Sequence, residues 1–179
     1  MRPLFVQGMM GSGKTSVGRE VAALAHAAFC DLDRRIERVF GETVAELFAV
    51  GEPRFRAAEH AALRSLVDEP GFAARTIVVA TGGGTAIDPA NRRLMRSCGV
   101  VVLLEVPLPV LADRLRHETD ARPLIAGASL EQQLAELWRA RADAYRDGSI
   151  AVDGSGTIAE VAARVHEAWQ AGARAWTPG

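Results

Sequence analysis

The residues with the clearest chemical meaning form one stretch, Gly8-Met9-Met10-Gly11-Ser12-Gly13-Lys14-Thr15, which satisfies the pattern G-x-x-x-x-G-K-[ST]. Glycines let the backbone curl so that successive N–H groups point at an anion, and a helix that begins near Gly13 adds its partial positive charge. Lys14 can reach the outer phosphates as a point charge, and the Thr15 hydroxyl is suited to Mg²⁺. The stretch therefore predicts that the chain binds a nucleoside triphosphate.

Two carboxylates, Asp31 and Asp33, end a short predicted strand that follows the first predicted helix. Ligands of open α/β sheets collect at the carboxyl ends of strands. Asp31 is suited to hold Mg²⁺ through water. In an extended segment Asp33 points the same way, so it can accept a hydrogen bond or a proton from an attacking hydroxyl. The alternative role for Asp33 is to cap the following helix.

Arginines and a glycine triplet supply candidates for an acceptor site. Arg56 is suited to a bidentate pair with an acceptor carboxylate, whereas Arg54 fits a solvated helix-face arginine. Gly82-Gly83-Gly84 follows a predicted strand, which indicates a backbone that another group approaches closely.

Two further arginines lie later in the chain. Arg122, on a polar loop stiffened by Pro123, can cover the phosphates and stabilise charge that moves between donor and acceptor. Arg141 is a second candidate for the acceptor carboxylate, but spacing alone does not separate it from Arg139 or Arg146.

Short apolar strands that alternate with helices must position these residues. Strands are expected over residues 4–6, 31–33, 76–81, 100–106 and 150–152, and the main helices over 17–28, 54–67, 89–98, 108–116, 130–146 and 158–171. Thr43 with Glu46 predicts a capping box for a further short helix, and Asp88-Pro89 a helix start. This pattern predicts a three-layer α/β domain with a mainly parallel sheet and helices on both faces.

Length and composition fit one domain over residues 1–179, with a core at about 3–171, a lid at about 115–127 and a flexible tail at 172–179. A formal net charge of -1 argues against binding to nucleic acid or to an anionic membrane. No apolar run approaches the roughly 20 residues of a membrane helix. Two isolated cysteines and no signal segment favour a cytoplasmic protein.

Motifs of other nucleotide-binding proteins are missing from the sequence. It has no N-K-x-D segment that would read guanine, and no apolar run that ends in Asp-Glu, because the strand over 100–104 leads into Glu105-Val106-Pro107. Phosphoryl transfer to a small hydroxyl compound suits the remaining features best.

Together, the order of these motifs resembles the shikimate kinase family. The resemblance runs from the phosphate loop to about Tyr145, and its landmarks are Asp31-Leu32-Asp33, Gly51-Glu52 with Phe55-Arg56 and Glu59, Gly82-Gly83-Gly84, Asn91-Arg92, Arg122-Pro123-Leu124, and Arg141 with Tyr145. The phosphate loop alone is generic, whereas the later motifs in this order are specific.

The resemblance implies a P-loop kinase fold with strand order 2-3-1-4-5. It implies ATP-dependent phosphorylation of the shikimate 3-hydroxyl, a step of aromatic amino-acid (chorismate) biosynthesis, by a cytoplasmic enzyme that we expect to be a monomer. If the family's roles are carried over residue by residue, shikimate is held by Asp33, Arg56, Gly82, Gly83 and Arg141. Lys14 and Arg122 stabilise the transferring phosphoryl group, Thr15 and Asp31 hold Mg²⁺, and ATP is bound by Gly11, Ser12, Gly13, Lys14, Thr15, Ser16 and Arg122.

The sequence departs from the family pattern at three places. Asp143 stands where the family usually has proline, the lid before Arg122 is about one residue shorter, which leaves the role of Arg116 open, and the segment after Asp153 lacks a proline that often lies against adenine.

Two alternatives stay open. One is another small-molecule kinase, such as a gluconate kinase, although that family has a His-Pro segment after its second-strand aspartate where this chain has Arg34-Arg35-Ile36-Glu37. The other is a catalytically silent shikimate-kinase-like regulatory domain.

Overall fold

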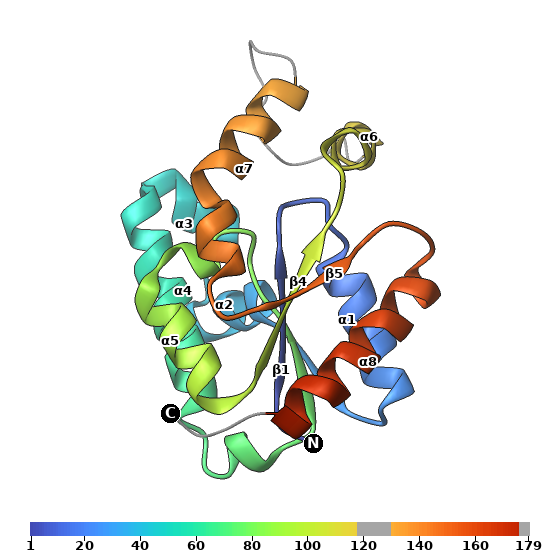
Figure 1. The fold of residues 1–179 in the computed structure, drawn as a ribbon. Helices are drawn as coiled ribbons and strands as arrows, with labels where there is room; N and C mark the ends of the chain where they lie inside the picture. The colour runs from blue at the N-terminus through green and yellow to red at the C-terminus, as the bar shows by residue number, and fades with distance from the viewer. Residues whose placement is uncertain (118–129, 176–179) are drawn as a thin grey trace.

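A five-stranded parallel sheet forms the centre of the molecule in the computed structural model, which describes residues 1–117 and 130–175 (Figure 1). The strands lie in the order β2-β3-β1-β4-β5, as the family resemblance implied. They are β1 (Leu4–Gly8), β2 (Ala28–Asp31), β3 (Ile77–Ala80), β4 (Val100–Glu105) and β5 (Ile150–Asp153). Because all pairs are parallel, the five carboxyl ends meet at one edge of the sheet.

Helices cover both faces of the sheet, so the expected three layers are confirmed. They are α1 (Lys14–Leu24), α2 (Leu32–Phe40), α3 (Val44–Val50), α4 (Glu52–Val67), α5 (Pro89–Cys98), α6 (Leu108–His117), α7 (Leu130–Arg146) and α8 (Ile158–Ala175), with the 3-10 turns η1 (Phe72–Ala74) and η2 (Thr85–Ile87). Figure 1 shows α1 and α8 on one side of the sheet and α2 to α5 on the other.

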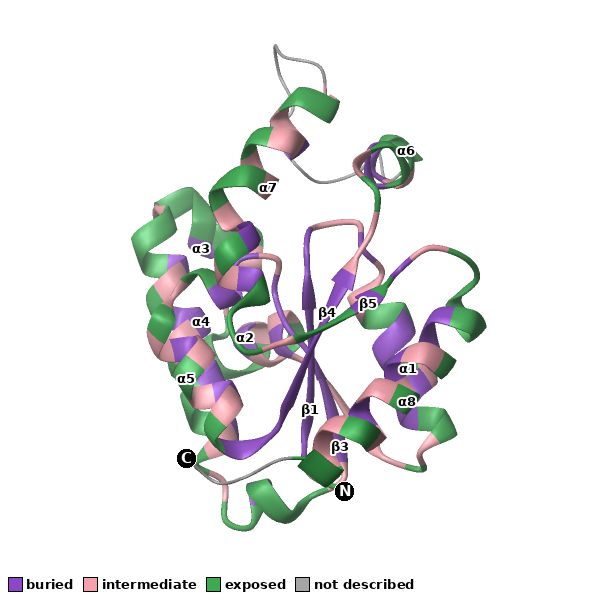
Figure 2. Ribbon diagram, in the orientation of Figure 1, coloured by how far each residue is buried: buried purple, intermediate pink, exposed green. Residues whose placement is uncertain are grey.

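Alternation along the strands divides the apolar residues between two core clusters. Leu4 and Val6 of β1 pack in the cluster with α1 and α8, whereas Phe5 packs in the cluster with α2, α4 and α5. Figure 2 shows the central strands buried from both sides. Burial on both faces explains why these strands are continuous apolar runs.

A third apolar cluster lies above the carboxyl edge and joins α6 and α7 to the phosphate loop. Its buried members include Met9, Leu103, Leu111, Leu134 and Tyr145. Helices α6 and α7 therefore lie above the edge of the sheet where the candidate residues meet, as the upper part of Figure 1 shows.

Local capping signals were correct, but the end of the second strand was not. Thr43 and Glu46 form the capping box, and Asp88 caps α5 by accepting a hydrogen bond from the Ala90 N–H. The second strand was expected over residues 31–33 and the first helix over 17–28, yet α1 ends at Leu24, β2 spans Ala28–Asp31, and Asp33 lies in the first turn of α2. The reason is that the Asp31 side chain accepts from the Arg34 N–H and starts the helix at this point.

The last helix is longer than the sequence indicated. It continues past Ala171 to Ala175, because Gly172 lies against Val100 and Ile150, and Ala173 packs on the apolar cluster of that face. A Cβ at Gly172 would come within 2.8 Å of both side chains, so a larger residue here would force them to shift.

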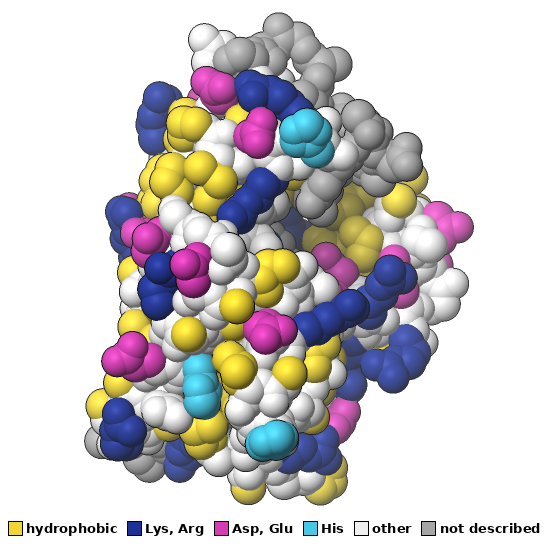
Figure 3. Space-filling view, turned by 90° about the vertical axis from the view of Figure 1, so that its right-hand side faces the viewer, with side chains coloured by type: hydrophobic (Ala, Val, Ile, Leu, Met, Phe, Trp, Pro, Cys, Tyr) yellow, Lys and Arg dark blue, Asp and Glu magenta, His cyan; other side chains and the backbone are white. Residues whose placement is uncertain are grey.

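The surface of the described residues carries both signs of charge. On the face drawn in Figure 3, Lys and Arg side chains are interspersed with Asp and Glu. None of the helices within residues 1–117 and 130–175 is long and apolar enough to cross a membrane. Cys30 and Cys98 are both free thiols, and burial raises the pKa of Cys98 to about 11.

Candidate active site

The phosphate loop lies between β1 and α1 at the carboxyl edge of the sheet. Gly13 is the N-cap of α1 in the left-handed conformation, with φ of 87°, which a residue with a side chain rarely adopts. No side chain caps this helix, so its first N–H groups face the space that an anion would fill. Lys14 curls over the loop, where its Nζ donates to the Met9 carbonyl over 2.8 Å.

The two expected metal ligands lie together at this loop. The Thr15 hydroxyl donates to Asp31 Oδ2 over 2.8 Å, while Asp31 Oδ1 accepts from the Arg34 N–H over 3.3 Å and is held by it. A hydroxyl and a carboxylate oxygen beside a phosphate loop form a hard donor set, which fits Mg²⁺ because this ion completes its shell with water and phosphate oxygens. The residues present therefore fit the ion that the sequence implied.

Arg56 extends from α4 and is held by two carboxylates. Its Nη1 donates to Glu59 Oε2 over 2.8 Å, and its Nε and Nη2 reach Glu52 Oε1 over 3.2 and 3.0 Å. The Glu59 side chain is only 1% exposed, whereas that of Glu52 is 61% exposed. Burial disfavours the Arg56 cation, but the bonds and charges of Glu59 and Glu52 outweigh this, so the pKa of Arg56 lies above its ordinary value.

The glycine triplet lies against these side chains. A Cβ at Gly82 would come within 2.7 Å of Glu59 Oε1 and 3.0 Å of Asp33 Oδ1, and a Cβ at Gly84 would overlap the Arg56 guanidinium. Asp33, Arg56 and the triplet are therefore brought together by α2, α4 and the segment after β3. The sequence singled out Gly82 and Gly83, but Gly84 is the glycine that makes room for Arg56.

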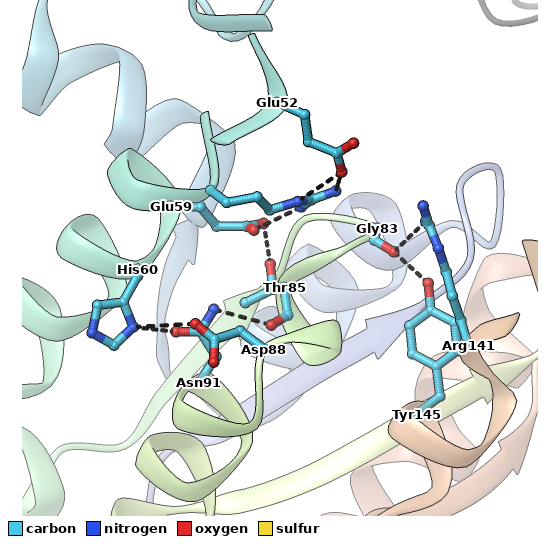
Figure 4. A network of polar contacts seen from close by, with 10 residues as sticks. Glu52, Glu59, His60, Gly83, Thr85, Asp88, Asn91, Arg141 and Tyr145 are labelled. Atoms are coloured by element: carbon cyan, nitrogen blue, oxygen red, sulfur yellow. Dashed lines mark hydrogen bonds and ion pairs between the residues drawn. The ribbon is translucent and has the colours of Figure 1, made fainter. Parts of the chain in front are cut away.

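Arg141 and Tyr145, one turn apart on α7, point at the same triplet (Figure 4). Arg141 Nη1 lies 3.5 Å from the Gly83 carbonyl, and the Tyr145 hydroxyl donates to that oxygen. Burial raises the pKa of Tyr145. The neighbouring Arg146 instead pairs with Glu105 over 3.0 Å, so the fold distinguishes Arg141 where spacing did not.

The remaining sequence predictions concern the lid and α7. Arg122 and most of the expected lid lie outside the described residues. Arg116 pairs with Glu131 over 2.9 Å, while Arg114, which the sequence analysis did not consider, donates to the Gly11 carbonyl over 3.3 Å. Asp143 is exposed on α7.

The sequence assigned no role in the site to Glu59 or Thr85, and it gave Gly84 only the close approach expected of the whole triplet. The spacing of Glu59 after Arg56 was visible as G-E-x-x-F-R-x-x-E, and Gly84 ended a visible triplet. Thr85 gave no local signal, because its hydroxyl is important only through a contact with Glu59, which lies 26 positions earlier in the chain.

Substitution of Gly84 tests the close approach of Arg56. Its φ of -122° is accessible to alanine, and the overlapping atoms belong to the end of a flexible side chain. We expect Gly84→Ala to push the guanidinium aside and to weaken binding of a carboxylate acceptor about tenfold. The protein should still fold, with a modestly lower unfolding midpoint because the displaced guanidinium pairs less well with the buried Glu59. Isothermal titration with the acceptor and thermal unfolding would measure the two effects. A large loss of stability with unchanged acceptor affinity would contradict this reading.

Fold and site together define a P-loop kinase for a small acceptor, with a phosphate loop on one side and, on the other, a half-buried arginine that two carboxylates hold. Comparison with known proteins narrows this class. The family model for shikimate kinase matches residues 10–170. A shikimate kinase of Geobacter metallireducens is 40% identical over 89% of this chain and 87% of its own length. That of Halorhodospira halophila is 41% identical over 93% of both chains.

A solved structure also points to the shikimate kinase family. The shikimate kinase from Acinetobacter baumannii in complex with shikimate is 32% identical and has a TM-score of 0.82, over 92% of this chain and 90% of the other. The chain belongs to the shikimate kinase family, which implies ATP as the phosphoryl donor and a divalent metal.

Proposed function

We propose that the protein transfers the γ-phosphoryl group of ATP to the 3-hydroxyl of shikimate and so makes shikimate 3-phosphate for aromatic amino-acid biosynthesis. The observation that carries this proposal is the Arg56 guanidinium, whose Nε and Nη2 both reach one carboxylate oxygen of Glu52. This geometry supports recognition of an acceptor carboxylate beside a phosphate loop. Gly82, Gly83 and Arg141 complete the acceptor side.

In the proposed reaction the shikimate hydroxyl oxygen forms a bond to the γ-phosphorus, the bond from that phosphorus to ADP breaks, and Asp33 accepts the hydroxyl proton. Lys14 and Arg122 offset the negative charge on the transferring group. The backbone of Gly11, Ser12 and Gly13, with Thr15 and Ser16, binds the phosphates. Mg²⁺, when bound by Thr15 and Asp31, neutralises phosphate charge.

Arg114 is a further candidate on the nucleotide side, because it already contacts the phosphate loop at Gly11. We also propose a single domain over residues 1–179 with a lid at about 115–127, a monomer in the cytoplasm, and no nucleic-acid or membrane partner.

A coupled assay of ADP release tests the function. It would compare shikimate, gluconate, AMP and no acceptor with the same enzyme and Mg·ATP, and we expect turnover with shikimate alone. Turnover with gluconate but not with shikimate would favour the other small-molecule kinase. Loss of ADP release with every acceptor, while shikimate still binds, would favour a regulatory domain.

Asp31→Asn tests the metal assignment. Asparagine keeps a side-chain oxygen that can accept from the Arg34 N–H, so α2 retains its cap. The variant loses the negative charge that attracts the cation, and we expect the Mg²⁺ concentration for half-maximal turnover to rise about tenfold or more. The measurement is a Mg²⁺ titration at saturating ATP and shikimate. An unchanged midpoint would exclude Asp31 from the metal site.

A further inference from the structure

Glu59, Thr85 and Asn91 form a series of polar contacts that connects α4, η2 and α5 (Figure 4). Arg56 lies at one end of this series because it donates to Glu59. Glu59 uses both of its carboxylate oxygens: Oε2 accepts from Arg56 over 2.8 Å, and Oε1 accepts from the Thr85 hydroxyl over 2.5 Å. Thr85 and Glu59 are completely buried. The direction of the Arg56 fork therefore depends on a carboxylate whose second oxygen is held by Thr85.

Asn91 holds the main chain of Thr85. Its side chain is buried, its Nδ2 donates to the Thr85 carbonyl over 3.0 Å, and its Oδ1 lies 2.7 Å from His60 Nδ1. The opposite orientation of the amide would set two acceptor oxygens, Oδ1 and the Thr85 carbonyl, against each other. His60 Nδ1 is therefore the donor to Asn91.

These contacts close a ring, because His60 is the residue after Glu59 on α4. One side of the ring runs from Glu59 to Thr85 and the other from His60 to Asn91, so α4 is tied to η2 and α5 at two points. Arg92 holds η2 independently, by donating to the carbonyls of Ala86 and Ile87 over 2.7 and 3.0 Å. Loss of the Asn91 amide would therefore free the Thr85 carbonyl without detaching η2, because the Thr85 N–H still donates to the Gly82 carbonyl.

From this ring we infer that Asn91 is a positioning residue for acceptor binding, which acts through Thr85 and Glu59 on the Arg56 guanidinium. The inference rests on the proposed function, because the acceptor is taken to be the carboxylate of shikimate. Asn91 itself is separated from the guanidinium by two residues of the series, so it does not touch the substrate. Its effect is to fix one of the two Glu59 oxygens, and a buried carboxylate with one oxygen released can turn away from Arg56.

Asn91→Ala is expected to raise the KM for shikimate about tenfold, while the KM for ATP and kcat stay within about twofold. Asn91→Asp keeps the volume of the side chain and removes the donor at neutral pH, so it should act in the same direction without a cavity. Met95→Ala is the matched control, since Met95 is fully buried one turn further along the same helix, packs in an apolar cluster and contributes no polar atom to the ring. It should lower the unfolding midpoint and leave the KM for shikimate unchanged.

A double-mutant cycle with Arg56→Lys separates positioning from general destabilisation. If Asn91 acts through the guanidinium, Asn91→Ala should change the KM for shikimate by less than about twofold in the Arg56→Lys background. If Asn91→Ala raises the KM for shikimate by the same factor in the parent and in the Arg56→Lys background, the inference is overturned. An unchanged KM for shikimate in both Asn91 variants would also overturn it.

A measurement without substrate keeps this inference distinct from the proposed function. Nitrogen-15 relaxation of the Arg56 Nε–H reports the order of the guanidinium, and we expect that order to fall in Asn91→Ala and to persist in Met95→Ala. A wild-type enzyme that does not phosphorylate shikimate would overturn the proposed function, whereas an unchanged Arg56 signal in Asn91→Ala would overturn the positioning role.

Discussion

Lys14→Ala should reduce turnover by about 10³-fold or more. Lys14 is the first residue of α1, and its Nζ already lies over the loop, 2.8 Å from the Met9 carbonyl. In phosphoryl transfer the protein contributes mainly position and charge stabilisation, so removal of the one mobile cation of the loop removes much of both. The coupled ADP-release assay at saturating shikimate and Mg·ATP measures this loss.

Two control measurements accompany Lys14→Ala: thermal unfolding, which checks the fold, and shikimate binding, which checks the acceptor site. Alanine is a good helix former at this half-buried position, so the unfolding midpoint should stay close to that of the parent. Binding of shikimate, followed by calorimetry, should also persist because Arg56 and Asp33 are untouched. Residual turnover above a tenth of the parent rate would show that Lys14 does not stabilise the transferring group.

The second large effect is expected for Arg56→Lys, which should raise the KM for shikimate about 100-fold. A lysine keeps the positive charge beside Glu59 but offers one compact ammonium in place of the fork that spans Glu59 and Glu52. Because the remaining charge cannot bind both the buried Glu59 and a substrate carboxylate in plane, the loss appears in acceptor binding. Initial rates over a wide range of shikimate concentrations measure it.

Arg54→Lys provides the matched control for Arg56→Lys. It makes the same chemical change on the same helix, but Arg54 pairs with Glu42 on the exposed surface, and its side chain is 49% exposed. Exposed pairs of this kind contribute little, so kcat and both KM values should not change. Equal effects of the two substitutions would remove Arg56 from the acceptor site.

The local features of the fold could be read from the sequence because each depends on residues close together in the chain. The phosphate loop, the capping box of Thr43 with Glu46 and the start of α5 at Asp88 and Pro89 are of this kind. The end of β2 was not predicted, although it also has a local cause. Asp31, which suits a metal ion, is also a good N-cap, and the helix that it caps ends the strand. The sequence did not show which aspartate would take that role.

The strand order came from the family resemblance and not from the pattern of strands, which is compatible with more than one order. The alternation of strands and helices specified only a parallel sheet with covered faces. The observed order, β2-β3-β1-β4-β5, places β1 and β3 side by side, so the phosphate loop and the glycine triplet lie at the same edge.

The sequence by itself determined the chemistry of this protein: a triphosphate loop, two aspartates, arginines for an anionic acceptor and glycines where the backbone is approached. Tertiary structure alone decided which of the two arginines faces the glycine triplet, because Arg141 lies at the Gly83 carbonyl while Arg146 turns to Glu105. It also placed Thr85 on Glu59 and Asn91 on Thr85. Such contacts join side chains that the fold brings together from separate elements. Their strength depends on the burial of both partners in the folded protein, and the spacing of residues along the chain does not encode this burial.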